Sequence, residues 1–132
     1  MPGNDLALLI EAAREAGRIA TAYVGGPLEV QDKAGGAGPV TAADLAVNAM
    51  LAEQLRSARP GYGWLSEESE DTTARLAADR VFIVDPIDGT RSFIEGNHNW
   101  AHSLAVAQGG VVVAAAIYLP MRDKLYAAAA GE

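Results

Sequence analysis

The stretch Val81-Phe82-Ile83-Val84-Asp85-Pro86-Ile87-Asp88-Gly89-Thr90 decides the fold that we expect for this chain. Its first four residues are β-branched or aromatic, which is typical of a buried strand. Two carboxylates three residues apart follow, and Pro86 stiffens a turn between them. Gly89 lets the backbone approach a ligand closely, and Thr90 adds a hydroxyl where a helix can begin.

Hard cations such as Mg²⁺ prefer carboxylate oxygens, and a helix N-terminus attracts anions. This stretch therefore predicts that a metal ion and a phosphate group meet at one point. The alternative interpretation is a strand, an Asp-Pro turn and a capped helix that bind nothing.

Composition limits the class of protein. The 132 residues are 50% hydrophobic and 20% charged, which suits one globular domain. The net charge of -7 argues against a nucleic-acid polymer as partner, and a phosphate site must be made attractive locally by metal or backbone dipoles. The absence of cysteine excludes disulfides and thiolate metal sites. We find no secretory signal and no apolar run near the roughly 20 residues that span a bilayer, so we expect a cytoplasmic protein without a membrane partner.

The order of elements predicts an α+β fold, with two long helices packed on a mostly antiparallel sheet. The helices are expected over residues 4–24, capped by Asn4 or Asp5, and from Thr41, as the cap, to about Arg59. Ala46, Met50 and Leu55 suggest the buried side of the second helix. Strands are expected over 28–31, 62–65, 81–84, 103–107, 111–119 and 124–128, with short helical segments from 72 or 73 to 78 and over 91–95.

Acidic residues gather at three of these boundaries: Asp44, the pair Glu67-Glu68, and Asp85 with Asp88. Two of the groups follow strands, so both are expected at one edge of the sheet. Convergent carboxylates repel one another unless cations neutralise them, and the reaction class that fits is metal-assisted hydrolysis of a phosphate ester. For the acidic run over 66–71, the alternative is an ordinary solvated loop.

Three segments resemble the N-terminal motifs of the inositol monophosphatase family, which belongs to a superfamily of Mg²⁺-dependent, lithium-sensitive phosphatases. They are Val40-Thr41-Ala42-Ala43-Asp44, Glu67-Glu68-Ser69 and Asp85-Pro86-Ile87-Asp88-Gly89-Thr90. The resemblance covers nearly all of the chain. The family continues with a second half that bears a Trp-Asp-x-Ala-Ala-Gly-type motif, and here the two tryptophans are followed by Leu65 and Ala101. The resemblance therefore implies that residues 1–132 form an N-terminal metal- and phosphate-binding domain, with the C-terminal half absent.

The resemblance also implies a metal site. Glu67 and Asp85 would hold a first Mg²⁺ together with the backbone carbonyl of Ile87. Asp85 would bridge to a second Mg²⁺, which Asp88 also binds.

Phosphate binding is implied for Asp88, Gly89 and Thr90, while Asp44 and Thr90 would orient and activate the attacking water. The catalytic residues are then Asp44, Glu67 and Thr90. Lys33 resembles a lysine on the family's mobile loop near the site.

Two functions follow from this resemblance. The first is Mg²⁺-dependent hydrolysis of a small phosphate monoester, with inositol phosphate, a 3′-phosphoadenosine nucleotide, fructose bisphosphate and histidinol phosphate all open as substrates. The segment Arg91-Ser92-Phe93-Ile94 favours the bisphosphate nucleotidase branch. The alternative is a catalytically incomplete fragment that keeps a weak cation site and has a structural or interaction role.

Three further residues and one strand carry expectations. We expect His98 and His102 to be loop or packing residues, and Arg91 to form a surface ion pair as readily as a phosphate contact. The run Val111–Leu119 is apolar on both faces and needs cover on both sides, so we expect a homodimer or other self-association.

Overall fold

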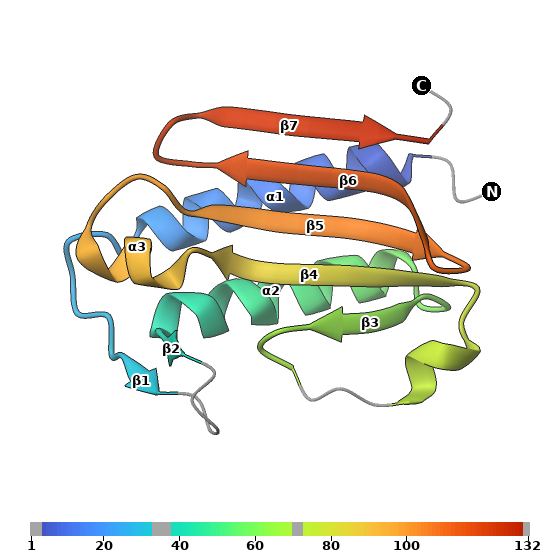
Figure 1. Ribbon diagram of the computed structural model, residues 1–132, viewed down its shortest axis with the longest axis horizontal. Helices are drawn as coiled ribbons and strands as arrows, with labels where there is room; N and C mark the ends of the chain where they lie inside the picture. The colour runs from blue at the N-terminus through green and yellow to red at the C-terminus, as the bar shows by residue number, and fades with distance from the viewer. Residues whose placement is uncertain (1–3, 33–37, 70–72, 131–132) are drawn as a thin grey trace.

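Two layers make up the molecule. A computed structural model describes residues 4–32, 38–69 and 73–130. Helices α1 (Asp5–Thr21) and α2 (Ala42–Ala58) both lie on one face of a five-stranded sheet (Figure 1). The strands are β3 (Gly63–Ser66), β4 (Arg80–Asp88), β5 (Ala101–Gln108), β6 (Val111–Leu119) and β7 (Lys124–Ala129). The expected α+β fold, with two long helices on a mostly antiparallel sheet, is confirmed.

The smaller elements lie around this frame. Strands β1 (Gln31–Asp32) and β2 (Pro39–Val40) form a separate antiparallel pair. A 3₁₀ helix, η2 (Thr73–Ala77), precedes β4, and a short helix, α3 (Thr90–Glu95), follows it. None of the helices in the described part of the chain has both the length and the apolar character needed to cross a membrane.

Sheet order equals chain order, from β3 at one edge to β7 at the other. Strands β4 to β7 are joined as antiparallel neighbours, whereas β3 pairs with β4 in parallel, with Ser66 opposite Val84. The segments that follow β3 and β4 therefore leave the sheet at the same end, where α3 and β2 also lie (Figure 1). This confirms that both acidic segments end at one edge of the sheet.

The core lies between the helices and one face of the sheet. Its largest fully buried apolar side chains come from both layers: Leu9, Leu51, Leu55, Phe82, Trp100 and Leu104. Small residues allow α1 to approach the sheet closely, because a Cβ atom added at Gly17 would lie 2.7 Å from the ring of Tyr118 on β6. This contact fixes the distance between α1 and β6.

Three local expectations are wrong in detail. Helix α1 ends at Thr21, and the side chain of Asn4 makes no capping hydrogen bond. Of the predicted strand over 28–31, only Gln31 lies in a strand, as the first residue of β1. Leu28 instead packs against the core, and its carbonyl oxygen accepts a hydrogen bond of 2.9 Å from the N–H of Ala42. In α2 Leu55 is buried as expected, but the other buried residues are Ala43, Asp44, Val47 and Leu51, whereas Ala46 and Met50 are only partly buried.

Candidate active site

The acidic end of β4 is a continuation of the strand, not the predicted turn. Asp85 pairs with Ser103 of β5, and the next registered pair is Asp88 with Ala101. Two residues of β4 therefore stand opposite a single residue of β5, which is a β-bulge. Cross-strand partners share a face, and Ala101 and Ser103 are two positions apart, so Asp85 and Asp88 lie on the same face. In a regular strand, carboxylates three positions apart would point to opposite faces.

A pocket of about 330 Å³ opens at this end of the sheet. Glu67 reaches it because β3 runs parallel to β4, so that the residue after Ser66 arrives beside the acidic end of β4. The full lining is Gly38, Pro39, Glu67, Asp85, Ile87, Asp88, Gly89, Thr90, Arg91 and Ser92. The structure thus brings all four predicted metal-binding residues and all three predicted phosphate-binding residues to one pocket.

Asp44 lies beneath this pocket and does not line it. The residue is fully buried in the first turn of α2, where Thr41 is the N-cap and forms a reciprocal capping box with it. Its Oδ2 accepts hydrogen bonds from the N–H and the hydroxyl of Thr41, at 2.8 and 2.6 Å. Its Oδ1 accepts a hydrogen bond of 2.9 Å from the hydroxyl of Thr90. Thr90 therefore connects a buried carboxylate to the pocket.

The backbone before Thr90 requires a glycine. Gly89 has φ of 91°, in the left-handed region, and a Cβ atom there would lie 2.9 Å from the carbonyl oxygen of Asn99. Only glycine lets α3 begin at Thr90 so close to this neighbouring loop. The Thr90 hydroxyl then also lies 3.1 Å from the carbonyl oxygen of Ile87.

Asn48 anchors the turn that carries Glu67. Its Nδ2 donates to Oγ of Ser69 at 2.9 Å and to the carbonyl of Glu68 at 3.3 Å, while its Oδ1 accepts from the hydroxyl of Ser66 at 2.6 Å. Trp64 adds a fourth bond, from its indole N–H to Oγ of Ser69, at 3.1 Å. Asn48 is a functional residue that the sequence does not reveal, because a lone asparagine in an alanine-rich helix has no recognisable pattern until its contacts are known.

His102 is a buried packing residue, as expected, and it contacts the acidic segment. Its Nδ1 lies 2.5 Å from the carbonyl oxygen of Pro86. Burial lowers the pKa of His102 to about 4, against weaker opposing effects from this hydrogen bond and from the charge of Asp44. The ring is therefore neutral near pH 7. His98, by contrast, is exposed in the loop after α3.

The atoms of the pocket that could coordinate a metal suit a hard cation that also keeps water ligands. They are oxygens only, from Glu67, Asp85, Asp88 and the backbone of Ile87. Over the described residues, no three or more His, Cys, Asp or Glu side chains are close enough together to hold a metal ion. Mg²⁺ retains several water ligands and uses one or two carboxylates with substrate phosphate, so this open arrangement fits it better than a closed cage would. Lys33 lies outside the described residues.

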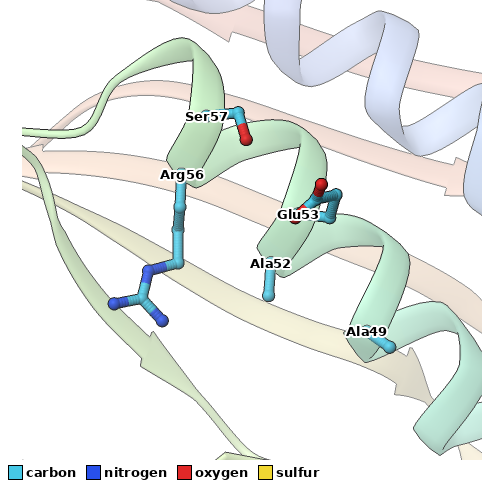
Figure 2. A pocket seen from close by; sticks show the side chains of 5 residues that line it. All are labelled: Ala49, Ala52, Glu53, Arg56 and Ser57. Atoms are coloured by element: carbon cyan, nitrogen blue, oxygen red, sulfur yellow. The ribbon is translucent and has the colours of Figure 1, made fainter.

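A second hollow, of about 390 Å³, lies along α2 (Figure 2). Its lining residues are Ala49, Ala52, Glu53, Arg56 and Ser57. Arg56 extends from the helix toward β3, and its guanidinium lies 5.9 Å from the centre of the Trp64 ring. One acid and one base on an exposed helix do not form a set of oxygen ligands. The pocket at the end of β4 is therefore the candidate active site.

Comparison with known proteins agrees with this geometry. The model of the inositol monophosphatase family matches residues 4–132. The chain belongs to that family. Similar curated members are an inositol-1-monophosphatase of Rhizobium meliloti (strain 1021), 35% identical over 96% of this chain, and a 3′-phosphoadenosine 5′-phosphate phosphatase of Mycobacterium leprae (strain TN), 38% identical over 90%. These relatives are phosphatases, that is, phosphoric monoester hydrolases.

Solved structures of similar proteins share the fold. The extragenic suppressor protein suhB of Bartonella henselae matches 96% of this chain with a TM-score of 0.88 and 37% identity. CysQ of Bacteroides thetaiotaomicron matches 97% with a TM-score of 0.79 and 30% identity. The chain spans about half the length of the relatives it matches, 47% and 46% of the two curated proteins and 49% and 46% of the two structures.

Proposed function

We propose that the protein hydrolyses a small phosphate monoester in a reaction that depends on Mg²⁺. The observation that carries the proposal is the pocket shared by Glu67, Asp85 and Asp88, with the Thr90–Asp44 hydrogen bond behind it. The names of the relatives support an inositol monophosphate or 3′-phosphoadenosine 5′-phosphate as substrate. Residues 1–132 would form the N-terminal metal- and phosphate-binding domain of a cytoplasmic enzyme.

The residues of the pocket divide into two groups. Glu67, Asp85, Asp88 and the carbonyl of Ile87 would hold the cation, which when bound neutralises charge and lowers the pKa of water. Asp88, Gly89 and Thr90 lie on the same wall and would position the substrate phosphate. Binding both groups in one pocket would place the phosphorus atom next to Thr90.

The reaction needs a path for one proton. A water oxygen attacks phosphorus, the ester P–O bond breaks, and its electron pair leaves on the alcohol oxygen, which takes up a proton. The attacking water donates to the Thr90 hydroxyl, which donates in turn to Oδ1 of Asp44 at 2.9 Å. The products are inorganic phosphate and the free alcohol. Because Asp44 is fully buried and its Oδ2 is held by Thr41, only Oδ1 is directed to this path.

Release of inorganic phosphate tests the proposal directly. The protein is incubated with inositol 1-phosphate or 3′-phosphoadenosine 5′-phosphate, with Mg²⁺ or with a chelator. Phosphate release that needs Mg²⁺, that Glu67→Gln removes and that Glu53→Gln leaves unchanged is the expected result. Glu53 is the matched control, because it is an exposed acid in the hollow along α2.

A catalytically incomplete fragment with a weak cation site is the second candidate. It is favoured by the absence, within the described residues, of three acidic or histidine side chains close enough to hold a metal. Calorimetric titration with Mg²⁺ separates the two functions. Binding without turnover supports the fragment, turnover supports the phosphatase, and neither binding nor turnover contradicts both.

A further inference from the structure

His102 is the single residue of β5 that stands opposite the bulge of β4. The registered pairs on either side of it are Asp85 with Ser103 and Asp88 with Ala101. His102 itself pairs with Tyr118 of β6 on its other side. Because Ala101 and Ser103 share a face with the two carboxylates, the ring of His102 points to the opposite face, toward the helices. Its side chain is fully buried there.

The ring supplies a hydrogen bond where the ladder between β4 and β5 is interrupted. The carbonyl oxygen of Pro86 lies 2.5 Å from Nδ1 of His102. A carbonyl only accepts, so Nδ1 carries the proton and the ring is the Nδ1–H tautomer. A bulge disrupts the regular ladder bonds of a strand pair, and a side-chain donor beneath the bulge compensates for this locally.

This bond orients the peptide unit between the two carboxylates. The peptide plane that joins Pro86 to Ile87 is rigid, so fixing its carbonyl fixes the direction in which the chain continues to Asp88. The Pro86 carbonyl is directed down to the ring, whereas the next carbonyl, that of Ile87, lies 3.1 Å from the Thr90 hydroxyl. Two consecutive carbonyls therefore have different partners, one below the sheet and one at the pocket.

The ring is itself held firmly. Trp100 packs edge-on against it, with ring centres 5.6 Å apart, and Phe93 of α3 packs edge-on against Trp100 at 4.8 Å. The other ring nitrogen, Nε2, is buried and has no hydrogen-bond partner among the described residues. A buried nitrogen without a hydrogen-bond partner lowers the stability of the fold. An apolar side chain would avoid this cost, so packing alone does not account for a histidine, whereas the bond to Pro86 does.

We infer that His102 is a positioning residue, which holds the β4 bulge in the form that brings Asp85 and Asp88 to one pocket. It acts through the Pro86 carbonyl and touches neither the pocket nor a ligand in it. Its consequence for cation binding rests on the proposed function, whereas its effect on the bulge does not.

The test uses three substitutions and a control. In His102→Asn, the side-chain amide N–H takes the place of Nδ1–H. In His102→Gln, the donor is displaced by one carbon, and in His102→Leu it is removed. Val106→Ala is the matched control, because Val106 is fully buried on the same face of β5 and lies four positions from His102.

The first measurement is hydrogen exchange at the backbone amides of residues 87–90, which needs no ligand. His102→Gln and His102→Leu are expected to speed exchange at these amides by about tenfold or more relative to other strand amides, as a lost hydrogen bond of about 1.4 kcal/mol implies. In His102→Asn, the exchange rates of these amides should equal those of the unsubstituted chain. In Val106→Ala, exchange at residues 87–90 should not increase more than exchange at other strand amides. Equal exchange in the Asn and Gln variants would overturn the inference, even if the Leu variant fails to fold.

The second measurement is the Mg²⁺ dissociation constant by calorimetry. His102→Gln and His102→Leu are expected to weaken binding by about tenfold or more, the usual effect of residues that orient metal ligands. His102→Asn and Val106→Ala should bind like the unsubstituted chain, and a loss of affinity in Val106→Ala equal to that in His102→Leu would overturn the inference. If the unsubstituted chain does not bind Mg²⁺, the proposed function fails, and hydrogen exchange alone decides the role of His102.

Discussion

The hydroxyl of Thr90 donates to Oδ1 of Asp44 across 2.9 Å, although 46 positions separate the two residues. The bond joins the first residue of α3 to the first turn of α2. Its two partners differ in exposure, because Asp44 is fully buried whereas Thr90 lines the pocket. A proton can therefore pass from the pocket to a carboxylate that water does not reach directly.

Removing the Thr90 hydroxyl tests this path. Thr90→Ala is expected to lower kcat of phosphate release by roughly 10²–10⁴, the usual contribution of general acid–base assistance. Thr90→Ser keeps the hydroxyl and should retain most of the activity. Steady-state kinetics at saturating Mg²⁺ would measure both, and an unchanged kcat in Thr90→Ala would remove the residue from the mechanism.

The carboxylate of Asp5 joins the start of α1 to the segment between α2 and β3 and to the start of β4. It accepts from Arg59 at 3.0 Å, from Arg80 at 2.9 Å and from the hydroxyl of Tyr62 at 2.9 Å, and its side chain is only 5% exposed. Asp5→Asn is expected to lower the free energy of unfolding by about 3 kcal/mol, because it breaks a buried ion pair and leaves charge behind. Urea unfolding measures this change.

The control for Asp5 is an exposed ion pair on the same helix. Glu15 pairs with Arg18, and their side chains are 39% and 65% exposed. Glu15→Gln should cost at most about 0.5 kcal/mol, since exposed helical pairs contribute little. Similar losses in the two variants would show that the Asp5 cluster is no stronger than a surface pair.

His102 makes stability depend on pH in the acid range. Burial lowers its pKa from 6.5 to about 4, so the unfolded chain takes up a proton at a higher pH than the folded chain. The stability contributed by the neutral ring is therefore complete above pH 6.5 and is lost as the pH falls toward 4, by up to about 1.4 kcal/mol per unit. Urea unfolding between pH 7 and 4.5 should show a steeper loss in the unsubstituted chain than in His102→Asn, and parallel curves would contradict this origin.

The sheet face opposite the helices carries exposed apolar side chains. Ile83, Ile117 and Tyr126 are 39%, 41% and 58% exposed, and Ile117 pairs directly with Tyr126. Monomeric proteins rarely expose continuous apolar patches of more than a few hundred Å². We therefore propose that the 132-residue chain self-associates through this face, and we expect sedimentation to show dimers or larger species.

Charge on that face should reverse the association. Ile117→Lys combined with Tyr126→Lys is expected to shift the chain toward monomer without unfolding it, because neither side chain belongs to the buried core. Lys124→Glu, on the same edge strand, serves as a control for a change of charge alone. A monomeric unsubstituted chain would contradict the proposal.

Local signals predicted much of this structure. Thr41 and Asp44 have the spacing of a capping box, so the start of α2 could be placed to the residue. The acidic segments after β3 and at the end of β4 were expected at one edge, because both were predicted to follow strands. The parallel pairing of Ser66 with Val84 is the physical reason that the expectation holds.

Features that depend on distant partners could not be predicted. The bulge in β4 exists only against β5, and nothing within Asp85–Asp88 distinguishes it from a turn. Alanine is compatible with either a buried or an exposed position, so the alanine-rich sequence of α2 does not reveal which side is buried. That side is defined by Val47 and Leu51, which are buried in the folded chain. Asn48 acquired its role from a turn 20 positions away.

Helix α1 packs on β5 and β6, although α2, β3, β4 and α3 all lie between it and these two strands in the chain. Its apolar side, including Leu9 and Ala13, has no sheet to cover it until residues near Tyr118 have been synthesised. Domains generally fold as units, so the nascent chain carries an exposed amphipathic helix until β5 and β6 have been made. Chaperones that recognise such helices can bind α1 during that interval, and the close fit of Tyr118 against Gly17 ends it.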